Sequence, residues 1–135
     1  MLACASGIRV NDEYPKNIAK VPNTALKNSM VIWEVLNTFS EPTRVRFCII
    51  EPGGYMRPHI DYNTDYSVRY QIPITTNDWC YVGVQRKGEK PELVHMPADG
   101  GVWFMNQGYN HAAWNMGKTD RIHLIVCVNG QDELQ

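Results

Sequence analysis

The stretch that decides the fold is TRVRFCIIEPGG, residues 43–54. Around Phe47, apolar side chains recur at every second position, which is the period of a strand with one buried face. Pro52, Gly53 and Gly54 then predict a turn, in which a glycine can take a positive φ. The chain keeps this period of two as far as residue 129, so we predict a mainly β protein.

The same pattern continues outward in short segments separated by turn residues. We expect further strands over residues 67–75, 79–85, 91–96, 102–106, 109–115 and 121–129. Asp99-Gly100-Gly101 predicts a hairpin between two of these segments. Short strands at nearly regular spacing favour a β-sandwich or a small barrel over a fold of alternating strands and helices.

The N-terminal part of the chain has a different character. Residues 1–28 are polar and broken by prolines, and they predict an irregular arm. Ser29 is a candidate cap for a short helix from Met30 to about Phe39, although the β-branched residues there keep a strand open. We therefore expect one domain over residues 1–135, with the arm and short helix over 1–42 and a β core over 43–129.

Composition narrows the class of protein. The chain has 135 residues, 44% of them apolar, and a net charge of -1. This balance lacks the basic footprint of a nucleic-acid-binding protein, and no apolar run is long enough for a membrane span. The four cysteines form no CxxC pair, which favours free thiols over disulfides or a zinc site. We expect a soluble, cytoplasmic protein that binds neither nucleic acid nor membranes.

One short motif suggests chemistry. His59 and Asp61 follow the turn at residues 52–54 and are two positions apart. In an extended segment, residues at this spacing project from the same face. An imidazole and a carboxylate side by side are two of the three ligands in the two-His, one-carboxylate set that binds Fe(II). Without further context, such a pair is more often an ordinary polar surface feature.

His111 and Arg121 extend this motif. His111 lies in a strand-like run and is followed by two alanines, which leave room for a ligand, although a lone histidine is more often structural. Arg121 begins a strongly apolar strand. If its side chain points inward it needs an anionic partner, because a buried unpaired charge is costly. The alternative is an edge arginine that reaches water.

The order of these motifs resembles a known family. The matching pieces are Pro52-Gly53-Gly54, Pro58-His59-Ile60-Asp61, RYQIPI at residues 69–74, Gly101-Val102-Trp103-Phe104, His111, Asn115 and RIHLI at residues 121–125. Together they are similar to the aspartyl/asparaginyl β-hydroxylase family of Fe(II)- and 2-oxoglutarate-dependent oxygenases, which also includes free-proline hydroxylases. The resemblance spans roughly residues 43–129, and the joint order is far more specific than any one piece.

The resemblance implies a fold and a set of ligands. The fold would be a double-stranded β-helix, the jelly-roll or cupin-like arrangement that the strand pattern also permits. Fe(II) would bind to His59, Asp61 and His111, as catalytic residues, with O2 as the oxidant. Arg121 would hold the distal carboxylate of 2-oxoglutarate. These assignments are expectations carried over from the family.

Three further positions bear on the co-substrate. Arg69 falls where the family keeps an arginine that contacts 2-oxoglutarate. Gln71 departs from the family, which has a histidine there. His123 has the same strand parity as Arg121, so we expect it to face the pocket or to support a ligand. His95, in contrast, is more simply a residue outside the metal site.

Substrate contacts are less defined. Arg57 and Tyr62 flank the metal motif on loop-like sequence, where they would contact substrate or form a solvent-facing rim. Trp114 is either a core aromatic residue or a substrate contact.

We expect a dioxygenase that hydroxylates an amino acid, free or in a peptide, while 2-oxoglutarate is decarboxylated to succinate. A small-molecule or peptide substrate is thus the expected partner. A non-catalytic jelly-roll module for a small ligand, or a metal cupin with another reaction, remains the alternative.

Overall fold

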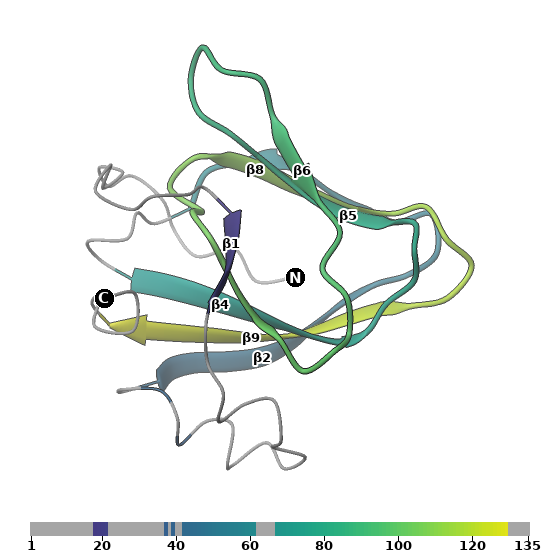
Figure 1. Ribbon diagram of the computed structural model, residues 1–135, viewed down its shortest axis with the longest axis horizontal. Coiled ribbons are helices and arrows are strands. Elements are labelled where there is room, and N and C mark those ends of the chain that lie inside the picture. The colour runs from purple at the N-terminus through teal and green to yellow at the C-terminus, as the bar shows by residue number, and fades with distance from the viewer. Residues whose placement is uncertain (1–17, 22–36, 38, 40–41, 62–66, 130–135) are drawn as a thin grey trace.

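The computed structural model describes residues 18–21, 37, 39, 42–61 and 67–129, and the strands of this part form two antiparallel sheets (Figure 1). In spatial order, the first sheet contains β1 (Ile18–Val21), β7 (Val102–Met105), β4 (Ser67–Thr75), β9 (Arg121–Asn129) and β2 (Pro42–Ile50). The second contains β3 (Tyr55–His59), β8 (Asn110–Asn115), β5 (Cys80–Gln85) and β6 (Glu92–Val94). Among the described residues there is no helix, and therefore none that could cross a membrane.

Most successive strands change sheet. The chain crosses from β2 to β3, returns in β4, crosses again to β5, and repeats this alternation from β7 to β9. This winding is that of a double-stranded β-helix, so the predicted fold class is confirmed. The hairpin expected at Asp99-Gly100-Gly101 is wrong. Gly100 does take a positive φ of 79°, but the strands on either side belong to different sheets and do not pair.

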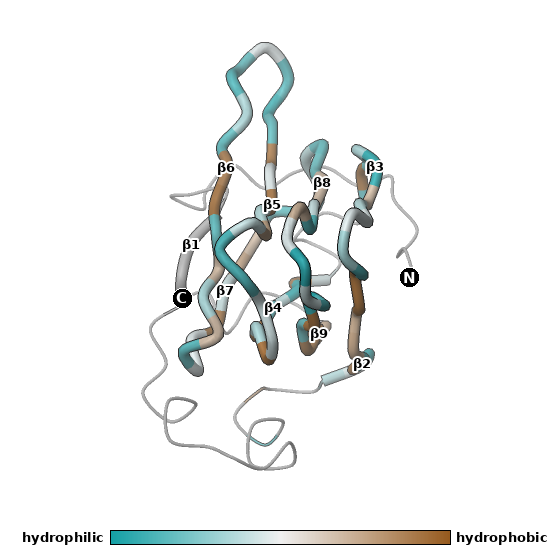
Figure 2. The backbone as a smooth tube through the Cα atoms, turned by 90° about the vertical axis from the view of Figure 1, so that its right-hand side faces the viewer, coloured by the Kyte–Doolittle hydropathy of each residue, from teal (hydrophilic) through white to brown (hydrophobic). Residues whose placement is uncertain are grey.

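A true hairpin joins β5 to β6. Gly83 of β5 pairs with Leu93 of β6, and the loop between the two strands contains Gly88 at a positive φ of 84°. The tip of this hairpin is hydrophilic and projects from one end of the molecule (Figures 1 and 2). This loop lies between the strands that were predicted over residues 79–85 and 91–96.

The larger sheet has apolar side chains on both faces. On its outer face, Val68 and Tyr70 of β4 pack with Phe104 of β7 and with Leu124 and Val126 of β9. The space between the sheets is filled by a second cluster, which includes Ile50, Val82, Val84, Met105 and Ala113. Strand alternation thus sends neighbouring residues of β9 into different environments.

Two segments differ from the sequence predictions. The arm was expected to be irregular, but Ile18–Val21 forms β1 and pairs with β7, because the edge of that sheet offers free backbone groups. Residues 55–59, expected to be extended or loop-like, form β3. The helix predicted from Met30 to Phe39 falls almost wholly outside the described residues, where only Asn37 and Phe39 can be placed.

Asn115, at the end of β8, attaches the turn between β2 and β3 to the smaller sheet. Its Nδ2 donates to the carbonyl of Ile50 at 2.9 Å, and its backbone exchanges hydrogen bonds with Gly53 and Gly54 at 2.8 and 3.0 Å. These bonds align β3 against β8. The three cysteines that the structure describes, Cys48, Cys80 and Cys127, are free thiols, as predicted.

Candidate metal centre

His59 and His111 face each other across two paired strands. They are direct register partners in the β3–β8 ladder, with ring centroids 4.2 Å apart. His111 is fully buried, whereas His59 is half-buried. The ladder therefore brings together two imidazoles that are far apart in the sequence.

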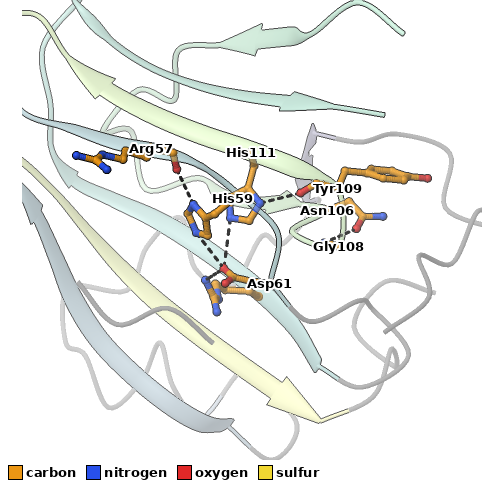
Figure 3. A network of polar contacts seen from close by, with 8 residues as sticks. Arg57, His59, Asp61, Asn106, Gly108, Tyr109 and His111 are labelled. Atoms are coloured by element: carbon orange, nitrogen blue, oxygen red, sulfur yellow. Dashed lines mark hydrogen bonds and ion pairs between the residues drawn. The ribbon is translucent and has the colours of Figure 1, made fainter. Parts of the chain in front are cut away.

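Each imidazole is oriented by its own strand. Nδ1 of His59 lies 2.7 Å from the carbonyl oxygen of Arg57, and Nδ1 of His111 lies 2.9 Å from that of Tyr109 (Figure 3). A carbonyl oxygen only accepts, so each Nδ1 carries the proton and donates it. In the neutral rings, the lone pair is then on Nε2. This is the tautomer that a metal-binding histidine has when its other nitrogen donates to the backbone.

Asp61 completes the cluster from the end of the same segment. Its backbone N–H donates to the carbonyl of Gln107 at 2.8 Å, which fixes the chain beyond β3. Its carboxylate oxygen Oδ2 lies 3.4 Å from Nε2 of His59 and 3.3 Å from Nε2 of His111 (Figure 3). The three donor atoms therefore converge on one point.

The carboxylate also pairs with an arginine. Nη1 of Arg69 donates to Oδ2 of Asp61 at 3.0 Å. Burial raises the pKa of Asp61, but the contact with His111 and the positive charge of Arg69 outweigh it, so the pKa lies below its ordinary value. Asp61 is therefore ionised at neutral pH, as a metal ligand must be.

The donor set fits a divalent transition metal. Nitrogen and oxygen ligands about 2.1 Å from such an ion lie roughly 3.0 to 3.4 Å from one another, depending on the angle. Within the described residues, Nε2 of His111 and Oδ1 of Asp61 are buried and have no hydrogen-bond partner. The contact between Nε2 of His111 and the carboxylate of Asp61 is favourable only when a proton or a metal cation lies between the two atoms. Two imidazoles and one carboxylate on one face are the ligand set of non-haem Fe(II) oxygenases.

Comparison with known proteins agrees with this geometry. The pattern of the aspartyl/asparaginyl beta-hydroxylase family matches residues 8–130. The chain belongs to this family. No curated protein matches the chain in sequence.

Solved structures share the fold of this family member. An oxidoreductase of the 2OG-Fe(II) oxygenase family from Burkholderia pseudomallei is 20% identical with a TM-score of 0.55, over 68% of this chain and 46% of that one. Oxalate oxidase bound to the substrate analogue glycolate is 19% identical with a TM-score of 0.53, over 93% and 56%. CapF, a capsular polysaccharide assembling protein of Staphylococcus aureus, is 16% identical with a TM-score of 0.54, over 67% and 24%. The chain thus spans between a quarter and somewhat over half of their lengths.

A cavity of about 160 Å³ opens beside the metal-donor cluster of this β-hydroxylase family member. His59 and His111 line one wall, and Arg69, Gln71 and Arg121 come from the larger sheet opposite. The metal motif and the basic side chains that the sequence analysis singled out therefore share one space.

Arg121 is a buried cation in the wall of this cavity. Only 2% of its surface is exposed, and within the described residues no carboxylate pairs with it. Its hydrogen bond to Oε1 of Gln71 is long, at 3.4 Å. Burial lowers its pKa to about 10, so the guanidinium stays charged at neutral pH. Because a buried charge without a countercharge is unfavourable, the guanidinium of Arg121 is suited to bind an anion in the cavity.

His123 and Gln71 support Arg121. Nδ1 of His123 lies 2.9 Å from Oε1 of Gln71, the same oxygen that accepts from Arg121. Burial, reinforced by the charges of Arg121 and His95, lowers the pKa of His123 to about 2, so it is neutral. His123 is thus behind Gln71 rather than at the metal, and His95 is bonded to the carbonyl of Cys80.

Three predicted substrate residues need separate comment. Trp114 is not a substrate contact in this cavity, because strand alternation puts it on the opposite face of β8 from His111, beside Gly83. Arg57 contributes its carbonyl to His59, but its guanidinium points away from the cluster (Figure 3). Tyr62 lies outside the described residues.

The sequence analysis missed Gln107. This residue is buried, it lines the cavity, and its backbone holds Asp61. The run Asn106-Gln107-Gly108 predicts only a turn, so no signal in the sequence marked it.

Proposed function

We propose that this chain is an Fe(II)- and 2-oxoglutarate-dependent dioxygenase that hydroxylates an amino acid, free or in a peptide. The observation that carries the proposal is one cavity with two contrasting walls. One wall is lined by His59 and His111, whose Nε2 atoms lie beside Oδ2 of Asp61, and the other presents the buried guanidinium of Arg121, which no carboxylate of the described residues pairs with. A dicarboxylate that contacts both walls satisfies the metal-binding set and the arginine together.

The reaction would combine 2-oxoglutarate, O2 and a substrate C–H to give succinate, CO2 and the hydroxylated product. Bound iron would supply the redox chemistry for this step. The chain would supply position and charge. His59, Asp61 and His111 would hold the metal on one face, and Arg121 would grip the distal carboxylate through two parallel hydrogen bonds.

Residues around these groups would hold them in place. Arg69 would fix the carboxylate of Asp61, since it already donates to Oδ2 at 3.0 Å. Gln71, the departure from the family pattern, would orient Arg121 through Oε1, and His123 would hold that amide. Met56 and Ile125 line the same cavity and would limit access of water to the reacting groups.

The proposal is tested first without oxygen. Adding Fe(II) and 2-oxoglutarate to the protein should produce a weak visible charge-transfer band. His59→Ala and His111→Ala should abolish it, whereas His95→Ala is the matched control, because His95 lies outside the donor cluster. An unchanged band in His59→Ala or His111→Ala contradicts the ligand assignment.

The arginine is tested through co-substrate affinity. Loss of a charge-assisted bond costs ~2 kcal/mol or more, so Arg121→Met should raise the Kd for 2-oxoglutarate at least roughly 30-fold. Arg121→Lys should recover only part of this loss, because an ammonium cannot form two parallel bonds. Arg86→Met, on the β5–β6 hairpin, is the control.

Succinate formation then decides between reaction classes. With Fe(II), ascorbate and oxygen, a screen of free amino acids and short peptides should find a substrate that raises succinate release. Metal binding without any succinate indicates a metal cupin with another reaction. Absence of both indicates a small-ligand binding module.

A further inference from the structure

We propose that Gln107 recognises the substrate, and that its side-chain oxygen accepts a hydrogen bond from an N–H of the amino acid. This inference rests on the proposed function and assigns a role to a residue outside the metal set and outside the co-substrate set.

The backbone fixes Gln107 beside the metal motif. It lies in the turn between β7 and β8, in which Oδ1 of Asn106 accepts from the N–H of Gly108 at 3.1 Å (Figure 3). Its carbonyl accepts from the N–H of Asp61 at 2.8 Å. Gln107 is thus tied to a proposed metal ligand by one hydrogen bond, and the residue lines the same cavity as His111 and Arg121.

The carboxamide of Gln107 is buried but unused. Only 6% of the residue is exposed, and Oε1 is buried and has no hydrogen-bond partner among the residues that the structure describes. Buried polar atoms in folded proteins almost always have a partner. Gln71, the other amide in the cavity, shows the contrast, because its Oε1 accepts from both Arg121 and His123. The side-chain oxygen of Gln71 is thus used within the protein, whereas that of Gln107 is available to a ligand.

The missing partner must be a hydrogen-bond donor. At neutral pH, the carboxylates and the keto group of 2-oxoglutarate only accept, so the co-substrate cannot donate to Oε1. Nδ1 of His59 and of His111 already donate to their own strands. The substrate is then the source of the donor. Every free amino acid offers one in its ammonium group, and every residue of a peptide except proline offers an amide N–H.

The experiment measures binding rather than turnover. The full chain is labelled with ¹⁵N and loaded with Zn(II) and 2-oxoglutarate, and the side-chain NH2 signals of Gln107 are assigned by their absence in Gln107→Leu. The probes are the free amino acids, their N-acetyl amides and, for each probe that binds, the analogue in which hydrogen replaces the nitrogen substituent. We expect the Gln107 signals to shift with at least one nitrogen-bearing probe. A shift with the free amino acids identifies the ammonium group as the donor to Oε1. A shift with the N-acetyl amides identifies the amide N–H of a peptide as the donor.

A paired comparison isolates the hydrogen bond. The wild-type protein should bind the nitrogen-bearing probe about tenfold or more tightly than its nitrogen-free analogue, and Gln107→Leu should bind both alike within about threefold. Gln85→Leu is the matched control, because Nε2 of Gln85 donates to the carbonyl of Glu89 outside this cavity. It should keep the wild-type preference.

Two results overturn the inference. The first is a Gln107→Leu variant that retains the preference, and the second is the absence of any shift with the whole panel. If the variant that retains the preference also binds Mn(II) more weakly, the amide is assigned to a metal-bound water instead. The charge-transfer band of the wild-type protein separates these failures from failure of the proposed function. A missing band rejects the oxygenase, and a present band leaves only the role of Gln107 rejected.

Discussion

His123 is a neutral imidazole held inside the molecule, where its partner is the amide of Gln71. Its pKa in the folded protein is about 2, whereas that of a histidine in an unfolded chain is near 6.5. Between these values the unfolded chain binds a proton that the folded protein does not. The contribution of His123 to the free energy of unfolding is therefore fully present above pH 6.5 and is lost as the pH falls from 6.5 toward 2.

This difference can be measured as the pH dependence of unfolding. His123 should account for about 2 kcal/mol of the stability that the wild-type protein loses between pH 7 and pH 5. Urea denaturation at each pH should show a flatter profile in His123→Asn, whatever its absolute stability. Parallel profiles for the two proteins would mean that His123 titrates normally and is not held neutral.

At the scale of single residues, part of the candidate site could be predicted from the sequence. The two-residue spacing of His59 and Asp61 predicted a shared face, and the structure brings both beside His111. Their partnership with a strand 50 positions away rested on family resemblance, because spacing says nothing about which strands pair. Gln107 had no signal at all, since its importance comes from the cavity it lines and from the partner it lacks.

At the scale of elements, β8 joins the functional site to the framework. His111, Ala113 and Asn115 all face the other sheet, so one strand places a proposed metal ligand, a core residue and a structural amide in a row. Asn115 is fully buried. It donates to the carbonyls of Ile50 and Thr119 at 2.9 and 2.8 Å, and its Oδ1 accepts from the N–H of Gly117 at 3.1 Å.

Removing this amide should be costly. Asn115→Ala leaves several buried groups without partners, and each costs roughly 1–3 kcal/mol, so the free energy of unfolding should fall by about 2–4 kcal/mol. Asn110→Ala, at the other end of β8, should change it by less than about 0.5 kcal/mol, because its side chain makes no hydrogen bond in the described structure. Urea denaturation compares the two variants. Equal effects would show that Asn115 is not the anchor of the β2–β3 turn.

Strands were easier to predict than their pairing. Alternating side chains predicted β4, β5 and β9 almost to their observed ends, because this pattern is local. The hairpin expected at residues 99–101 failed because a glycine turn fixes the chain direction only locally, and the sheet that a strand joins depends on distant partners. Trp114 was left open between a core aromatic residue and a substrate contact for a related reason, because the sequence did not show which face of β8 would carry His111.

At the scale of the whole molecule, the two faces of the larger sheet have different roles. The outer face packs into an apolar cluster, and the inner face forms a wall of the cavity at the candidate site. Leu124 belongs to the outer cluster, and Ile125, the next residue of β9, lines the cavity. These neighbours offer a direct comparison of the two faces.

The two faces should respond differently to truncation. Leu124→Ala should lower the free energy of unfolding by about 2–5 kcal/mol through the cavity it leaves, with the affinity for 2-oxoglutarate kept within about twofold. Ile125→Ala should weaken 2-oxoglutarate binding severalfold, because it widens the cavity that is proposed to hold the co-substrate. Urea denaturation and calorimetric titration on the folded proteins give the two quantities. A larger loss of affinity in Leu124→Ala would contradict the division of roles between the faces.

The pairing of Arg69 with Asp61 bears on how the protein is assembled. If the chain folds before the proposed iron binds, the carboxylate of Asp61 is buried for a time without its metal, and an unaccompanied carboxylate at this depth would oppose folding. The guanidinium provides the countercharge during that interval. The metal-free protein should therefore stay folded, with its metal-binding residues already in place. Removing the metal with a chelator and adding it back should be reversible and should not unfold the protein.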